Sequence, residues 1–337
     1  MKNLFLVLFL SVLVWSCDTE PKKTVDQQDQ PKENVKEDSL GWINTQILEN
    51  PNDPGLYIAK ARYMLEKGSV ENAVIEADKA IGLDSNNIAY YNFKADAYYD
   101  AQDMLNAKEV YLKVLEKDEE NEHANQKMAW ISLIAGQHES CFTYANNVLK
   151  QNQYIPEPYY LKGLAYKELG NFKLAVSNFR TATEQDNDYI EAWLQLGYMY
   201  DVAEDTLAGA FYENALRIDS NNIDALYAFG MHLQDWGIAR DAINQYEHIL
   251  RVNDGYQDAY YNIGFIYLEM LQENDSAIMY YDKLLALNPY NFKGYYNRGL
   301  AFERNEMFPQ ALSDYDKALE LKPDYTPAAK GKSRVIK

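Results

Sequence analysis

The stretch Phe292–Tyr325, FKGYYNRGLAFERNEMFPQALSDYDKALELKPDY, contains the pattern that decides the fold. Small and apolar residues recur at helical spacing in two runs, with a break at Glu306–Pro309 and a closing Pro323. These residues are Tyr295, Gly299, Phe302, Ala311, Tyr315 and Ala318. The pattern predicts two amphipathic helices in an antiparallel pair, in which small residues let the backbones approach and aromatic rings fill the remaining space.

The same pattern repeats eight times between residues 54 and 325. The first helix of each unit has a small residue at one place: Ala61, Ala95, Ala129, Gly163, Gly197, Gly230, Gly264 and Gly299. The second helix has a small partner: Ala73, Ala107, Cys141, Ala175, Ala208, Ala242, Ala277 and Ala311. Large and small residues at these spacings resemble the tetratricopeptide repeat. The resemblance implies an all-α fold, a right-handed α-solenoid of helix-turn-helix repeats, with units at 54–87, 88–121, 122–155, 156–189, 190–222, 223–256, 257–291 and 292–325.

Three features interrupt or close this series. The fifth unit lacks one residue in its turn, Val202–Leu207, and the seventh has one more, which we place in the turn Glu269–Asp275. The third unit has polar or small residues where its neighbours have large apolar ones, which indicates either a bend or loose packing. We expect capping helices at 39–53 and 326–337, because the ends of a solenoid expose apolar surface.

The N-terminus has the composition of an export signal. Residues 1–16 combine an early lysine with a short apolar run, and Cys17 follows at once, an arrangement that resembles a bacterial lipobox. We expect a lipoprotein signal peptide at 1–16, a lipidated Cys17 and a disordered tether over 17–38. The bulky Trp15 leaves an ordinary cleaved signal as the alternative.

The formal net charge of −19 argues against a nucleic acid or an anionic membrane face as partner, because both require a basic surface. The chain contains no phosphate-binding loop, nucleophile elbow or zinc-protease motif. Its four histidines share no metal-ligand spacing, and Cys141 occupies a tight-packing position. We therefore expect no enzyme activity, no cofactor and no metal.

The resemblance implies that first helices line a concave groove and that ligands lie there. Counting along each unit predicts an aromatic and aliphatic track suited to a protein or peptide partner. Packing between adjacent helices is the alternative explanation for its tyrosines. The track consists of Tyr160, Leu164, Tyr198, Tyr227, Met231, Tyr261, Phe265, Tyr296 and Leu300.

A row of acidic residues runs beside this track near the ends of the first helices. Carboxylates are disfavoured there by the helix dipole, so the row indicates a cationic or amphipathic partner. Capping of the second helix and general solubility are the alternatives. The row consists of Glu168, Asp201, Asp235, Glu269 and Glu303.

Together these patterns resemble those of envelope tetratricopeptide lipoproteins of Gram-negative bacteria. That resemblance implies a lipid-anchored scaffold or adaptor in the cell envelope, most readily at the outer membrane, that serves assembly, secretion or control of envelope enzymes. A glycan-binding lipoprotein for nutrient uptake and a structural spacer without a ligand are the alternatives. The sequence leaves the partner, the membrane leaflet and the oligomeric state open.

Overall fold

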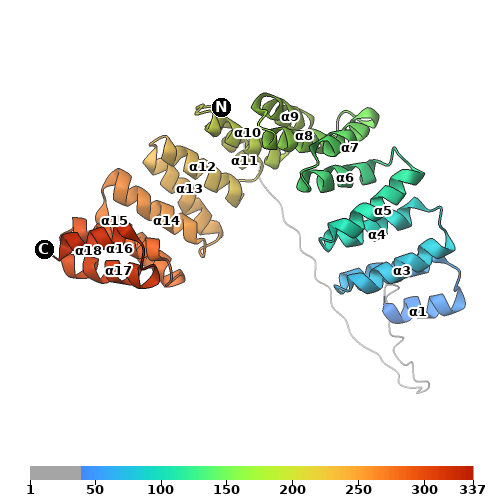
Figure 1. Cartoon of the computed structure of the whole chain (residues 1–337), viewed down its shortest axis with the longest axis horizontal. Helices are drawn as coiled ribbons and strands as arrows, with labels where there is room; N and C mark the ends of the chain where they lie inside the picture. The colour runs from blue at the N-terminus through green and yellow to red at the C-terminus, as the bar shows by residue number, and fades with distance from the viewer. Residues whose placement is uncertain (1–38, 337) are drawn as a thin grey trace, which may run out of the picture.

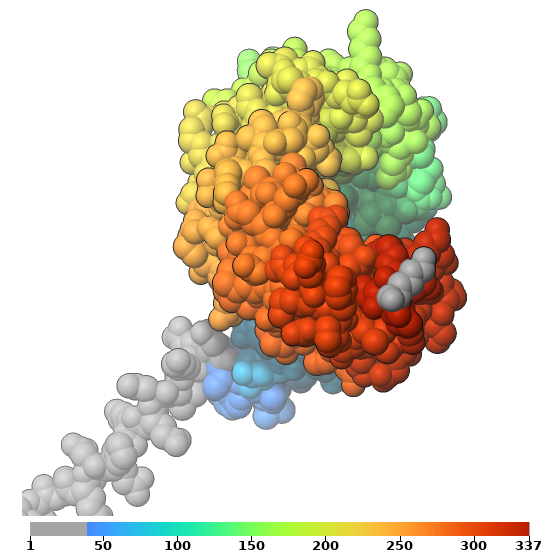
Figure 2. Space-filling view, turned by 90° about the vertical axis from the view of Figure 1, so that its left-hand side faces the viewer, coloured from blue at the N-terminus to red at the C-terminus, as the bar shows by residue number. Residues whose placement is uncertain are grey.

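The computed structural model describes residues 39–336, and within that range the chain folds into eighteen α-helices. The expected signal peptide, Cys17 and the tether lie outside the described residues. The helices succeed one another along an arch, as Figure 1 shows. Seen from one end of the arch in Figure 2, the C-terminal helices (red) lie in front of the green units. The fold is an all-helical solenoid.

Sixteen of these helices form eight antiparallel pairs, which we number as units one to eight. The first helices of the units are α2 (Pro54–Glu66), α4 (Ile88–Asp100), α6 (Glu122–Ile134), α8 (Pro156–Glu168), α10 (Ile190–Val202), α12 (Ile223–Asp235), α14 (Gln257–Phe265) and α16 (Phe292–Arg304). The second helices are α3 (Val70–Leu83), α5 (Met104–Lys117), α7 (His138–Gln151), α9 (Phe172–Gln185), α11 (Ala208–Ile218), α13 (Ala239–Val252), α15 (Asn274–Leu287) and α17 (Phe308–Leu321). The helices α1 (Leu40–Glu49) and α18 (Thr326–Val335) lie at the two ends.

Each unit turns between its helices through one residue in the left-handed region. Glycine fills this place in four units, and glutamine or glutamate fills it in the other four. Many first helices begin at an Asp or Asn whose side chain accepts a backbone N–H bond, as Asn222 does from Ala225. The left-handed residues are Gly68, Gln102, Gly136, Gly170, Glu204, Gly237, Gln272 and Glu306.

Close approach of the two helices depends on the small residues of the first helix. A Cβ atom on Gly163 would lie 2.5 Å from the Phe179 ring, and one on Gly230 would lie 2.7 Å from the Tyr246 ring. The same relation joins Gly299 to Tyr315, where the distance would be 3.0 Å. The glycines therefore make room for the aromatic side chains that form the core of units four to eight.

First helices form the concave face. The first helices of neighbouring units come close together, as in the pairs α6–α8 and α10–α12. Within residues 39–336, no pair of second helices is equally close. Because the more closely spaced layer lies on the inside of a curve, the second helices form the convex face.

Unit seven differs in part from the sequence expectation, and the packing of unit three argues against one of its two alternatives, loose packing. The extra residue of unit seven is absorbed by a π-helix, Ile266–Leu271, which continues α14, so our placement of it in the turn Glu269–Asp275 was only partly right. Unit three is well packed around a polar group. Asn125 is fully buried, donates to two backbone carbonyls at 3.0 and 2.9 Å, and accepts from Asn147 at 3.1 Å.

The C-terminal helix α18 packs on unit eight. Ala328 is buried, and a Cβ on Gly331 would lie 2.5 Å from the Tyr315 ring. Two basic side chains of α18 pair with acidic residues of unit eight: Arg334 with Glu303 at 2.6 Å, and Lys332 with Asp316 at 2.5 Å.

Candidate functional site

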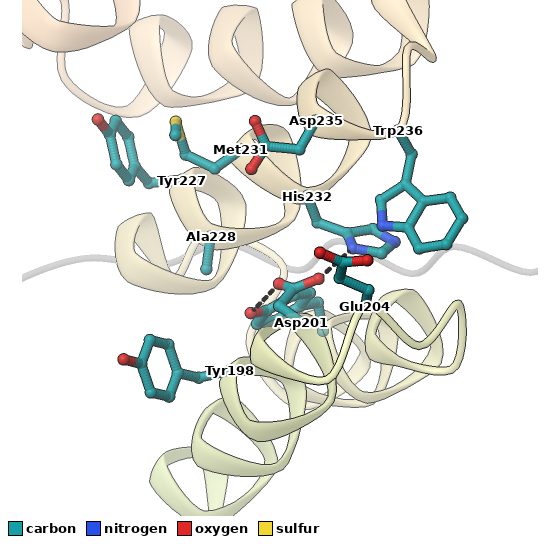
Figure 3. A pocket seen from close by; sticks show the side chains of 10 residues that line it. Tyr198, Asp201, Glu204, Tyr227, Ala228, Met231, His232, Asp235 and Trp236 are labelled. Atoms are coloured by element: carbon teal, nitrogen blue, oxygen red, sulfur yellow. Dashed lines mark hydrogen bonds and ion pairs between the residues drawn. The ribbon is translucent and has the colours of Figure 1, made fainter.

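A cavity of about 740 Å³ opens between the first helices of units five and six. Five of its lining residues belong to the predicted track or acidic row: Tyr198, Asp201, Tyr227, Met231 and Asp235. The other five were not predicted: Glu204, Tyr212, Ala228, His232 and Trp236. Figure 3 shows the two tyrosines Tyr198 and Tyr227 at one side, Trp236 at the other, and the carboxylates between them.

The cavity lies beside the place where two clusters of buried apolar side chains adjoin. One cluster includes residues from Ala129 to Met199, and the other includes Leu226, with Leu216 of unit five packed against it. A polar network joins units five and six beside this contact. Asp201 accepts a hydrogen bond from the Tyr212 hydroxyl at 2.6 Å, and its other carboxylate oxygen lies 2.5 Å from Nδ1 of His232.

This network is largely buried. The His232 side chain is 6% exposed, and Tyr212 is 3% exposed. Burial, reinforced by the bond to Asp201, raises the pKa of the Tyr212 hydroxyl, so this group remains a hydrogen-bond donor at neutral pH. Two hydrogen bonds hold the Asp201 carboxylate in place and thereby fix the floor of the cavity.

The sequence missed these residues for definite reasons. Glu204 and Trp236 belong to the turns that follow the first helices, whereas the prediction considered only helix positions that face inward. His232 was weighed only as a metal ligand. Its contact with Asp201 spans 31 residues, so it depends on how one unit is rotated against the next.

Several predicted track residues do not line the cavity, and Tyr160 is the clearest correction. Its side chain is only 8% exposed, and its ring packs against Phe179 and Tyr189 at centroid distances of 5.8 and 5.1 Å. Burial also raises the pKa of its hydroxyl. The packing interpretation therefore fits Tyr160, because Phe179 and Tyr189 of its own unit and Trp130 of unit three cover its ring.

Among the other tyrosines of the track, Tyr227 and Tyr261 take part in contacts between units, and Tyr296 packs within unit eight. Tyr227 accepts a hydrogen bond from Asn262 at 3.4 Å, and Tyr261 accepts one from Asn297 at 3.2 Å. Tyr296 packs edge-on against Tyr325 at 5.4 Å. These rings are half-buried, as are the aliphatic and aromatic members Leu164, Phe265 and Leu300. Tyr198 is the most open of the track tyrosines, with 51% of its surface exposed.

Most of the acidic row is also engaged within the protein. Glu168 pairs with His138 at 2.7 Å, and Glu269 pairs with Arg304 at 2.8 Å. Glu303 accepts bonds from Arg334 and from Tyr315. These three carboxylates link neighbouring helices, so their charges are partly balanced within the protein, and contact of the whole row with a partner stays a prediction. Asp235 is exposed and makes no ion pair within the described residues.

The other candidate reactive groups are accounted for by packing. Cys141 is fully buried, and burial, followed by the nearby Glu168 charge, raises the pKa of its thiol to about 12. Across residues 39–336, no group of three or more His, Cys, Asp or Glu side chains is placed to hold a metal ion. None of the helices in that range has the length and apolar character needed to cross a bilayer.

Comparison with known families supports the repeat architecture. Family models described as tetratricopeptide repeat match residues 292–325 and, separately, residues 88–121, 156–189 and 257–291. These four segments are tetratricopeptide repeats. A solved structure titled "YrrB: a TPR protein with an unusual peptide-binding site" superposes with a TM-score of 0.50 at 22% identity, covering 56% of this chain and 97% of YrrB. This likeness shows that the fold is a tetratricopeptide solenoid.

Two curated proteins have related repeat sequences. Superkiller protein 3 of Schizosaccharomyces pombe is 24% identical over 285 residues, which cover 73% of this chain. UDP-N-acetylglucosamine–peptide N-acetylglucosaminyltransferase of Giardia intestinalis is 30% identical over 113 residues, or 34% of this chain. The present chain spans 20% and 8% of the lengths of these two relatives. The similarity is thus to part of each relative.

Proposed function

We propose that this tetratricopeptide solenoid is a non-catalytic scaffold that binds a segment of a protein partner along its concave face. The observation that carries the proposal is the cavity between α10 and α12. It combines exposed aromatic surface with carboxylates at a place where the repeats do not fill the space with their own side chains. Aromatic side chains provide large contact areas at low entropic cost, which suits recognition of a peptide segment.

We also propose that the scaffold is tethered to a membrane of the bacterial envelope through a lipidated Cys17, with residues 17–38 as the spacer. The support is the sequence pattern of residues 1–17 alone. In this setting the scaffold serves envelope assembly, secretion or regulation of envelope enzymes. A Cys17→Ser variant that remains with the membrane fraction as fully as the wild type contradicts the anchor.

Site-specific photo-crosslinking in cells tests the binding face. A benzoylphenylalanine residue is placed at Tyr198 on α10, and in a separate variant at Met279 on α15, a second helix. Both side chains are about half exposed, at 51% and 46%, so accessibility does not distinguish them. We expect a discrete crosslinked protein from position 198 and none from position 279.

The opposite pattern places binding on the convex face, and the absence of a discrete product from either position favours a spacer without a ligand. The crosslinker is preferable to alanine at Tyr227, Tyr261 and Tyr296, because those rings contribute to packing between units or within unit eight. Their replacement would disturb the fold together with any binding.

A further inference from the structure

The described side chains that line the cavity between units five and six include several carboxylates but no lysine or arginine. The three carboxylates belong to Asp201, Glu204 and Asp235. Asp201 is hydrogen-bonded by Tyr212 and His232. Glu204 and Asp235 are exposed and form no ion pair within residues 39–336. The cavity therefore presents two carboxylates that have no ion-pair partner among the described residues.

Its walls are suited to the flat face of a cation. Tyr198 and Trp236 are 51% and 43% exposed, and Tyr227 lines the same space (Figure 3). A cation that lies over such rings is attracted by their quadrupoles. The chain already shows this interaction nearby, because Lys167 of the preceding unit lies 5.2 Å from the centre of the Tyr198 ring.

The site is also held in shape before any ligand arrives. The Asp201 carboxylate is fixed by two hydrogen bonds, and Glu204 belongs to the tight turn at the end of α10, with a φ of 54°. Trp236 follows the last residue of α12 directly. A preformed site loses little conformational freedom on binding, so its contacts translate efficiently into affinity.

We propose that this cavity binds the side chain of an arginine in the partner segment, an inference that rests on the proposed function. A guanidinium group stacks on aromatic faces and donates to carboxylates at the same time, and it is more weakly hydrated than an ammonium group. The Glu204 and Asp235 carboxylates accept its hydrogen bonds, and the Tyr198, Tyr227 and Trp236 rings enclose its plane. The cavity exceeds the size of one side chain, so neighbouring residues of the segment enter with the arginine.

The test begins with an unbiased library. A phage-displayed library of random nonapeptides is selected on the full-length protein. We expect enriched sequences with arginine at one fixed position. Enriched peptides without a basic residue overturn the arginine proposal but leave peptide binding intact. The absence of any enrichment contradicts the proposed function itself, so the two failures are distinguishable.

Affinity measurements then test whether the arginine side chain binds in this cavity. One selected peptide is compared with its citrulline analogue, which replaces the guanidinium by a neutral group of similar shape. On the wild-type protein, citrulline should weaken binding at least tenfold. The double variant Glu204→Gln/Asp235→Asn should bind the arginine peptide at least tenfold more weakly than the wild type does. It should bind the citrulline analogue no more weakly than it binds the arginine peptide. Equal binding of the two peptides by the wild type overturns the proposal.

The variants are chosen to leave the fold intact. Glutamine already occupies the left-handed turn position at Gln102 and Gln272, so it is tolerated at 204. The matched control Glu213→Gln/Asp254→Asn removes the same charge from exposed residues that do not line the cavity. This control should bind the arginine peptide like the wild type; a tenfold loss here assigns the effect to overall charge and overturns the proposal.

Competition by free N-acetylarginine amide at the peptide's own concentration identifies a small cation as the ligand and likewise overturns it.

Discussion

Two tyrosines at equivalent places in neighbouring units have opposite hydrogen-bonding environments. Tyr315 donates to Glu303 at 2.5 Å, whereas the buried Tyr281 hydroxyl has no hydrogen-bond partner of good geometry among the described residues, because the amide of Asn297 beside it donates to Tyr261 instead. The π-helix of unit seven accounts for the difference, because Glu269 at its centre pairs with Arg304 instead. A buried hydroxyl without a partner costs free energy that the folded state must offset elsewhere.

We therefore expect opposite effects from the same substitution. Tyr281→Phe removes an unsatisfied hydroxyl and should raise the free energy of unfolding by about 1 kcal/mol. Tyr315→Phe removes a hydrogen bond to a charged group and should lower it by about 1.5 kcal/mol. Urea denaturation followed by circular dichroism measures both. A loss of stability in Tyr281→Phe comparable to that in Tyr315→Phe means that its hydroxyl is satisfied after all, for example by a buried water.

Contacts within one unit could be predicted from the sequence, whereas contacts between units could not. The fit of Gly299 against Tyr315 was predictable, because both residues belong to one unit and their relation follows from helical periodicity. The contact of Asp201 with His232 was not, because it joins two units. Its geometry depends on the rotation between them, which periodicity within a unit does not define. The same reason explains why the acidic row was assigned to a partner, although most of its members pair within the protein.

At the level of helices, α18 is held on unit eight by a carboxylate with several donors. Glu303 accepts bonds from Arg334 at 2.6 and 2.8 Å and one from Tyr315. Burial alone would raise the pKa of this carboxyl, but the bonds from Arg334 and Tyr315 outweigh burial and lower it. The folded pKa is thus below that of the unfolded chain, which is about 4.3. The resulting stabilisation is present above the unfolded pKa and disappears as the pH falls through the folded pKa.

The lowered pKa of Glu303 gives a prediction for the variant Glu303→Gln. At pH 7 it should lower the free energy of unfolding by about 1 to 2 kcal/mol and expose the amides of α18 to hydrogen exchange. As the pH falls below the unfolded pKa and through the folded pKa of Glu303, the difference between the two proteins should shrink. Urea titrations from pH 7 to pH 3 measure it.

A matched control is available one helix away. Glu320 of α17 is exposed and pairs only with Lys317 on the same helix, so Glu320→Gln should change stability little over this pH range. A Glu303→Gln deficit of constant size from pH 7 to pH 3 contradicts the assignment of the effect to ionised Glu303.

In the molecule as a whole, the interface between units five and six differs from its neighbours. Two apolar clusters adjoin there, with Leu216 of α11 packed against the second, and the polar network of Asp201 and the cavity lie beside this contact. The stability of a repeat protein is close to a sum of unit stabilities and nearest-neighbour interface terms. Because a cavity and a buried polar network replace part of the apolar contact at this interface, we expect the solenoid to separate there first, into two cooperative blocks, residues 39–222 and 223–336.

The variant Asp201→Asn should make this separation visible, because it weakens both hydrogen bonds of the network without changing the size of the side chain. We expect its urea unfolding, followed by hydrogen exchange and mass spectrometry, to resolve into one transition for each block.

Asp96→Asn is the matched control. Asp96 also accepts from a tyrosine, Tyr111, and contacts a histidine, His123, but it lies beside an apolar cluster that is continuous across units two and three. That variant should lose stability without splitting the transition at that interface, since apolar packing still couples the units. A single coincident transition in Asp201→Asn shows that α11 and α12 couple the blocks without the network.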